Sequence, residues 1–194
     1  MRLMPGLVIG LVLLTGLTRP AWAHESRASR VWSLLEATAG IREGQGPVRL
    51  FVFFDPNCPY CHRVYEALQP YVGRGGIAVR WIPVGILTQS SYGKAAALLE
   101  AKDPERALAR MEEGTRAGRG DIRPRRANAQ TAQALARAVA LFQESGAAGV
   151  PFLVYRTGVG QLRAVTGEPP PGALQAIIAR LMAQAKTKSR KAKP

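Results

Sequence analysis

The two cysteines of this chain, Cys58 and Cys61, lie two residues apart and closely follow an apolar run at residues 48–54. The run is rich in β-branched and aromatic residues, which is typical of a strand buried on both faces of a parallel or mixed sheet. Cys58 then stands where a helix N-cap would fall, and Pro59 stands at the first helical position, where a proline loses no hydrogen bond. The segment therefore predicts a strand that leads into the N-terminus of a helix, with both cysteines at the junction.

The helix that begins at Pro59 is predicted to run to about residue 72. On it Cys61, Val64 and Leu68 share one apolar stripe, so we expect Cys61 to face the core. Cys58, at the start of the helix, is expected to stand at an exposed tip. The two thiols should therefore differ in how readily a reagent reaches them.

The rest of the chain alternates between strand and helix patterns. Residues 77–84 predict a second strand, residues 151–155 and 161–165 predict two more, and an amphipathic helix follows them. An alanine-rich region at about residues 90–145 predicts helices inserted between the second strand and the third. This order is that of an α/β, thioredoxin-like fold with a helical insertion.

The N-terminus predicts export. Arg2 is followed by an apolar run from Leu7 to Leu17 and then by the small-x-small pattern Ala21-Trp22-Ala23 of a signal-peptidase site. A transmembrane anchor is the alternative, but the run is well short of the roughly 20 residues that span a bilayer. We expect a cleavable secretory signal.

Four segments are expected along the chain: a signal at residues 1–23, a linker helix at 24–47, the thioredoxin-like domain at 48–184 and a basic tail at 185–194. The formal net charge is +14. An exported protein meets little nucleic acid but much anionic lipid, so this charge favours weak contact with an anionic membrane surface. A merely solvated tail is the alternative.

Three uses of the cysteine pair compete: half of a zinc site, a structural disulfide and a redox-active pair. A structural zinc site takes four ligands, and beside the cysteines the chain offers only His24, near the expected mature N-terminus, and His62, adjacent to Cys61. A structural disulfide gains stability from the length of chain that it closes, and this loop is tiny. We therefore favour the redox pair and expect neither a metal nor a cofactor.

Redox chemistry accounts for each residue of the motif. The unpaired N–H groups and the dipole of a helix N-terminus stabilise a thiolate at Cys58, and Cys61 can resolve the mixed disulfide that Cys58 forms. Pro59 removes one N–H donor, while Tyr60 adds bulk without charge. His62 either assists proton transfer or is solvated; these alternatives stay open.

The segments "DPNCPYC", "IAVRWIPVGIL", "KAAALLEAKDP" and "AAGVPFLVY" resemble the DsbC/DsbG family of bacterial periplasmic thiol-disulfide oxidoreductases. The resemblance, closest to the catalytic domain of DsbG, implies an enzyme in which Cys58 attacks, Cys61 resolves and Pro151 is a cis-proline lying against them. Asp55 matches the family, with turn formation as the plain alternative. Also implied are a periplasmic location, exported protein substrates that contain cysteines, and a membrane-bound redox partner of the DsbD or DsbB type.

Three features differ from that family or from related folds. Only a short segment precedes the first strand, where the family has a dimerisation domain, so we expect a monomer. Val150 precedes the expected cis-proline, where a threonine is expected in DsbG-like proteins and a valine is more like DsbA. Val52 stands where thioredoxin-like proteins often keep a buried acid, so proton transfer is expected to pass through water.

The sequence thus predicts a periplasmic thiol-disulfide oxidoreductase that reduces or isomerises disulfides, or oxidised cysteines, in exported proteins. One alternative is a monomeric oxidase of the DsbA type, which donates its disulfide. Another is an adaptor that keeps the fold, does no catalysis, and docks through its basic clusters.

Overall fold

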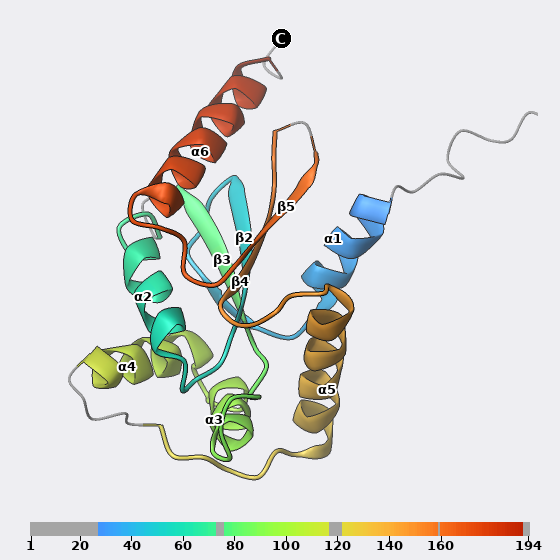
Figure 1. Cartoon of the computed structure of the whole chain (residues 1–194), viewed down its shortest axis with the longest axis vertical. Coiled ribbons are helices and arrows are strands. Elements are labelled where there is room, and N and C mark those ends of the chain that lie inside the picture. The colour runs from blue at the N-terminus through green and yellow to red at the C-terminus, as the bar shows by residue number, and fades with distance from the viewer. Residues whose placement is uncertain (1–26, 73–75, 117–121, 159, 192–194) are drawn as a thin grey trace, which may run out of the picture.

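The computed structural model describes residues 27–72, 76–116, 122–158 and 160–191 and shows a sheet with helices on both faces (Figure 1). The predicted signal at residues 1–23 and His24 lie outside the described residues. The strands are β1 (Ile41–Glu43), β2 (Val48–Phe54), β3 (Ile77–Pro83), β4 (Phe152–Arg156) and β5 (Leu162–Thr166). The helices are α1 (Arg27–Ala37), α2 (Pro59–Leu68), α3 (Ser91–Leu99), α4 (Pro104–Arg116), α5 (Ala129–Glu144) and α6 (Ala173–Lys191).

The sheet has the order β1-β3-β2-β4-β5, with β2 at its centre. β2 pairs parallel with β3 and antiparallel with β4, and all of its residues except Arg49 are buried. The prediction of a buried strand in a mixed sheet is confirmed. The parallel β2-α2-β3 unit places the start of α2 directly beyond the C-terminal end of β2.

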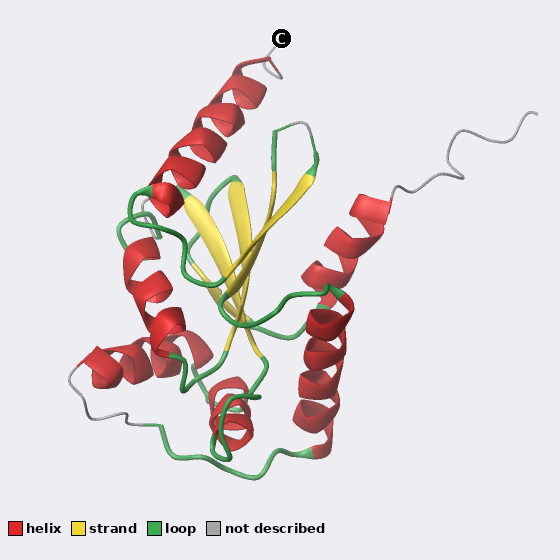
Figure 2. Ribbon diagram, in the orientation of Figure 1, coloured by secondary structure: helices red, strands yellow, loops and turns green. Residues whose placement is uncertain are grey.

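Two hydrophobic layers cover the sheet (Figure 2). On one face, Val52 and Phe54 of β2 pack in a cluster with residues of α2, α4 and α6, and Cys58 and Cys61 belong to this cluster. On the other face, Phe53 of β2 packs with residues of α1 and α5. The helices inserted between β3 and β4 therefore divide between the two faces, and α4 lies on the face that carries the cysteines.

The structure contains one strand that the sequence did not predict. β1 pairs antiparallel with β3 inside the segment that we expected to be a linker. Three residues are too few to show a period of two, so the pattern could not reveal it. Its first and last residues, Ile41 and Glu43, are both buried, which leaves Glu43 in need of polar partners inside the protein.

Two helix boundaries also differ from expectation. α2 ends at Leu68 instead of near residue 72, because Pro70 has no N–H to donate to the preceding turn. Val72 instead forms an isolated bridge with Ile77. α6 continues to Lys191, beyond the predicted start of the tail at residue 185. Within the described part of the chain, no helix combines the length and the apolar character that crossing a bilayer requires.

Candidate active site

Cys58 is the N-cap of α2 and uses its sulfur as the capping acceptor. The backbone is extended there (φ −88°, ψ 112°), and the N–H of Cys61 donates to Cys58 Sγ over 3.1 Å. Pro59 occupies the first turn, as predicted. A thiol is a weak acceptor and a thiolate a strong one, so this capping geometry favours the charged form of Cys58.

The environment of the Cys58 sulfur lowers its pKa from 9.0 to about 7. The largest cause is the hydrogen bond from the Cys61 side chain, and the backbone N–H groups of Cys61 and Tyr60 act in the same direction. Burial and the charge of Asp55 oppose the shift. About half of the Cys58 thiol is therefore ionised at neutral pH.

The pKa of the Cys61 thiol is shifted in the opposite direction. Its side chain is 2 % exposed, and burial raises its pKa far above the ordinary value, with the hydrogen bond to Cys58 acting in the same direction. Both cysteines are free thiols in this structure. The pair therefore consists of a more readily ionised sulfur at Cys58 and a protonated donor at Cys61, an arrangement that suits an attacking and a resolving thiol.

The loop before β4 lies against the Cys58 sulfur. The Val150–Pro151 peptide bond is cis, as the sequence predicted, and the Val150 carbonyl oxygen lies 3.8 Å from Cys58 Sγ. The expectation that Cys58 stands exposed is wrong: only 5 % of the residue is exposed. The helix tip is covered because residues 92 positions later in the chain pack over it, which a helical pattern alone cannot show.

Asp55 forms the turn between β2 and α2 and is buried. Its carboxylate accepts hydrogen bonds from the Asn57 N–H, from Ser91 Oγ, and from the N–H groups of Ile86 and Leu87, at 2.6 to 2.9 Å. These bonds join the turn to the loop after β3. Asp55 thus holds the cysteine turn in place, which agrees with the turn-forming alternative.

His62 lies between two carboxylates. Its Nδ1 is 2.6 Å from Glu112 Oε2, and its Nε2 is 3.6 Å from Glu66 Oε2. Its side chain is only 13 % exposed, so the solvated alternative for His62 does not hold. Burial raises the pKa of Glu112, and the hydrogen bond from His62 opposes that rise.

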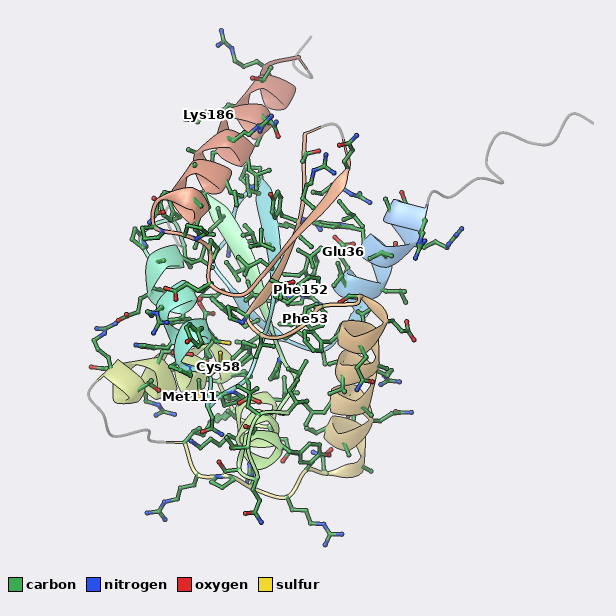
Figure 3. The ribbon with its side chains drawn as sticks, viewed as in Figure 1. Glu36, Phe53, Cys58, Met111, Phe152 and Lys186 are labelled. Atoms are coloured by element: carbon green, nitrogen blue, oxygen red, sulfur yellow. The ribbon has the colours of Figure 1, made fainter. Side chains whose placement is uncertain are left out.

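Sequence reasoning missed Glu112. The residue is 4 % exposed and lies on the buried side of α4, next to Met111 and one turn after Leu108. Figure 3 shows Met111 beside Cys58, where α4 meets the start of α2. The sequence did contain a signal, because Glu112 is an acid among the apolar positions of an amphipathic helix. It did not indicate which residue would pair with that acid.

A cavity of about 280 Å³ opens beside Cys58. Its walls come from the cysteine turn and from α2, α3 and α4, and they include Asp55, Cys58, His62, Lys94 and Glu112. Lys94 Nζ donates to Asn57 Oδ1 at 2.7 Å. The cavity brings the predicted sulfur, turn and histidine residues together with two charged residues from the inserted helices.

Two further residues named in the sequence analysis, Tyr60 and Val52, are not part of the cavity wall. Tyr60 is 53 % exposed, and the Arg63 guanidinium lies 4.5 Å from its ring centroid. Val52 is fully buried, so no acid occupies its position on β2. Within the described residues no cluster of histidine, cysteine or acidic side chains could hold a metal ion.

Two curated proteins are similar to the chain in sequence. The chain is 34 % identical over 154 residues to the thiol:disulfide interchange protein DsbG of Pseudomonas aeruginosa, an alignment that covers 78 % of this chain and 59 % of that protein. The Escherichia coli DsbG is 28 % identical over 153 residues, covering 76 % of this chain and 60 % of the relative. The chain thus spans about three fifths of the length of these curated relatives, and the resemblance noted in the sequence is confirmed.

Solved structures agree on the fold. A periplasmic thioredoxin-like protein from Salmonella enterica serovar Typhimurium superimposes with a TM-score of 0.65 at 20 % identity, covering 79 % of this chain and 97 % of that one. The catalytic domain of Proteus mirabilis ScsC gives 0.61 at 20 % identity, over 80 % and 96 %. A family model described as a thioredoxin-like domain matches residues 35–181, which takes in every strand of the sheet and the whole cysteine turn. The chain therefore belongs to the thioredoxin-like domain family.

Proposed function

We propose that this chain is a periplasmic thiol-disulfide oxidoreductase that reduces or isomerises disulfides, or oxidised cysteines, in exported proteins. The observation that carries the proposal is the unequal pair at the start of α2, in which the pKa of Cys58 is lowered to about 7 while burial keeps Cys61 protonated. The likeness to DsbG supports the assignment.

The reaction uses the two sulfurs in sequence. The Cys58 thiolate attacks one sulfur of a substrate disulfide, which forms a Cys58–substrate disulfide and releases the other substrate sulfur as a thiolate. Cys61 then loses its proton and attacks Cys58 Sγ. This forms the Cys58–Cys61 disulfide and releases the second substrate sulfur, so two electrons pass from the protein to the substrate.

The pKa of Cys58 favours reduction or isomerisation over disulfide donation. In thioredoxin the attacking cysteine has a pKa of about 7, whereas in the strong oxidant DsbA it is about 3.5. A more stable thiolate makes the reduced form more stable and the disulfide more oxidising. A value of about 7 at Cys58 therefore supports the reducing role, which suits a membrane partner of the DsbD type that supplies electrons.

The basic residues at the end of α6 suit weak electrostatic binding to an anionic membrane surface. Figure 3 places Lys186 at the end of the molecule opposite Cys58. A contact there leaves the cysteine end free for substrate. We also predict that the protein acts as a monomer, which light scattering on the processed protein tests directly.

Trapping and redox titration test the function together. A Cys61→Ser variant should accumulate mixed disulfides with exported proteins through Cys58, and the matched Cys58→Ser variant should accumulate none. The reduction potential of the pair should lie closer to that of thioredoxin, about −270 mV, than to that of DsbA, about −120 mV. A value near the DsbA figure would assign the oxidase role instead. If no disulfide substrate reacts with the reduced protein, the chain is a non-catalytic adaptor.

A further inference from the structure

The contact between His62 and Glu112 has no part in the sulfur chemistry described above. Glu112 is almost completely buried, and its carboxylate lies 2.6 Å from His62 Nδ1. A buried carboxylate is costly unless it is paired and hydrogen-bonded. The inserted helix α4 nevertheless places one on the wall of the cavity that holds Cys58.

His62 lies one helical turn from the attacking sulfur. Its N–H donates to the Cys58 carbonyl over 3.2 Å. Both side chains line the same cavity of about 280 Å³, which has room for a water molecule that carries a proton between them.

Both ring nitrogens of His62 face carboxylates. Glu112 lies on the buried side, and Glu66 lies toward the surface, where its other oxygen accepts from Arg116 Nε at 2.6 Å. An imidazolium can donate to both carboxylates, whereas a neutral ring can donate to only one. The remaining charged groups on the cavity wall are Asp55, which accepts four hydrogen bonds, and Lys94, which donates to Asn57.

Elimination among the buried acids also favours Glu112. Within the described residues, the buried carboxylates are Glu43, Asp55 and Glu112. Asp55 accepts from backbone N–H groups and a serine, and Glu43 accepts from side chains of Tyr65, Gln69 and Trp81. Of these three, only Glu112 is paired with an imidazole, a side chain that can both accept and donate a proton.

We propose that His62 carries the proton of the exchange reaction at Cys58 and that Glu112 is the positioning residue that orients its ring. This inference rests on the proposed function above. Neutral His62 takes the proton of the Cys58 thiol and becomes an imidazolium, which Glu112 stabilises. The Cys58 thiolate attacks the substrate disulfide, and His62 gives the same proton to the departing substrate sulfur. One S–S bond breaks, one forms, and the substrate leaves as a thiol while His62 returns to its neutral form.

The test compares two disulfide probes whose leaving thiols differ in pKa and therefore in how much protonation speeds their departure. An aromatic thiol of low pKa leaves readily as a thiolate, whereas an alkyl thiol of high pKa leaves more slowly without protonation. The rate of mixed-disulfide formation is measured in a Cys61→Ser background with two probes, an aromatic nitrobenzoate disulfide and oxidised glutathione. Glu112→Gln and His62→Gln should each lower the rate with oxidised glutathione at least about tenfold more than they lower the rate with the aromatic probe, which depends on His62 only for deprotonation of the Cys58 thiol.

A pH series and a matched control complete the test. In the background protein, the ratio of the alkyl rate to the aromatic rate should fall as pH rises, and in His62→Gln it should be flat. Glu113→Gln, an exposed neighbour on the same helix, should behave as the background protein does. Equal slowing with both probes would reduce the contact to a packing role, and no slowing would overturn the inference.

The outcomes also separate this inference from the proposed function. If the background protein reacts with neither disulfide, the proposed function fails; if it reacts with both and the variants change neither ratio nor rate, only the inference fails. Should Glu112→Gln be unfolded by circular dichroism, the His62→Gln variant still supplies the ratio. Should both be unfolded, Glu66→Gln, at the other ring nitrogen, must lower the ratio, and an unchanged ratio there contradicts the proposal.

Discussion

Two buried acids lie against successive turns of α2, and their surroundings differ in kind. Glu43, at the end of β1, accepts from Tyr65 Oη at 3.1 Å, from Gln69 Nε2 at 3.2 Å and from Trp81 Nε1 at 2.8 Å. Glu112, on α4, is paired with His62 in the cavity beside Cys58. The two are almost equally buried, at 6 % and 4 % exposed.

The difference shows that neighbours, more than burial, determine what a buried carboxylate does. The donors around Glu43 keep their protons at neutral pH; burial raises the pKa of Tyr65, and the charge of Glu43 adds to that rise. The contacts of Glu43 therefore form a fixed hydrogen-bond network that joins β1 and β3 to the helix. The partner of Glu112 is instead an imidazole, which can both accept and donate a proton and lines the cavity that holds Cys58.

Breaking the fixed network should have the largest effect on stability. Glu43→Gln replaces one carboxylate oxygen with an NH₂ group that faces other donors, and it removes hydrogen bonds to a charged acceptor, each contributing about 1.5 to 3 kcal/mol. We expect the free energy of unfolding to fall by about 3 kcal/mol, measured by denaturant titration followed through tryptophan fluorescence. The Cys58 thiol should titrate as before. A variant with unchanged unfolding but altered thiol reactivity would reverse the roles of the two acids.

The titration of Cys58 gives the next effect in size. The rate of alkylation, followed by mass spectrometry from pH 5 to 10, should reach half of its maximum near pH 7, two pH units below the value of 9.0 for a free thiol. Cys61 should stay unlabelled. Because the Cys61 side chain is the main cause of the shift, Cys61→Ala should raise the midpoint, whereas Cys61→Ser, which keeps a donor, should raise it less. Equal midpoints in the two variants would contradict this cause.

Removing the partner of Glu112 should destabilise the protein in a pH-dependent way. Burial raises the pKa of Glu112, so the folded state holds that proton more tightly than the unfolded chain does. Its stabilising contribution is therefore complete below the unfolded value and is lost as pH rises through the folded one. In His62→Gln the buried charge lacks its partner, so the loss should be about 2 kcal/mol at pH 8 and well under half of that at pH 4.

The double variant serves as the control for this pH dependence. His62→Gln combined with Glu112→Gln leaves no buried charge at the contact, so the additional loss of stability that His62→Gln shows at pH 8 over pH 4 should be absent. Persistence of the pH dependence in the double variant would assign it to another group.

The smallest effect on stability is expected at Arg116, which pairs with Glu66 at the surface next to His62. The ion pair of Arg116 with Glu66 joins side chains that are 62 % and 38 % exposed. Exposed pairs contribute about 0 to 1 kcal/mol. Arg116→Gln should therefore change the free energy of unfolding by less than about 1 kcal/mol, and by still less in high salt. A larger loss would mean that Glu66 takes more part in holding His62 than its exposure indicates.

The sequence predicted much of the fold because most elements carry local signals. β2 is a continuous apolar run, α2 begins with a cap followed by a proline, and the Val150–Pro151 bond is cis as expected. β1 and the early end of α2 were missed. β1 is too short for a visible period, and Pro70 acts only on the final turn of an otherwise regular pattern.

The sequence by itself determined the chemistry of the pair, since the spacing of Cys58 and Cys61 at a helix start makes one sulfur a capping acceptor and turns the other inward. Only the tertiary structure decided the surroundings of that pair. The carbonyl of Val150 covers Cys58 from 92 residues away, and Glu112 reaches His62 across 50 residues. Caps and periodicity act within one or two helical turns, whereas partners brought in by packing depend on how separate elements meet, and a local pattern carries no information about that.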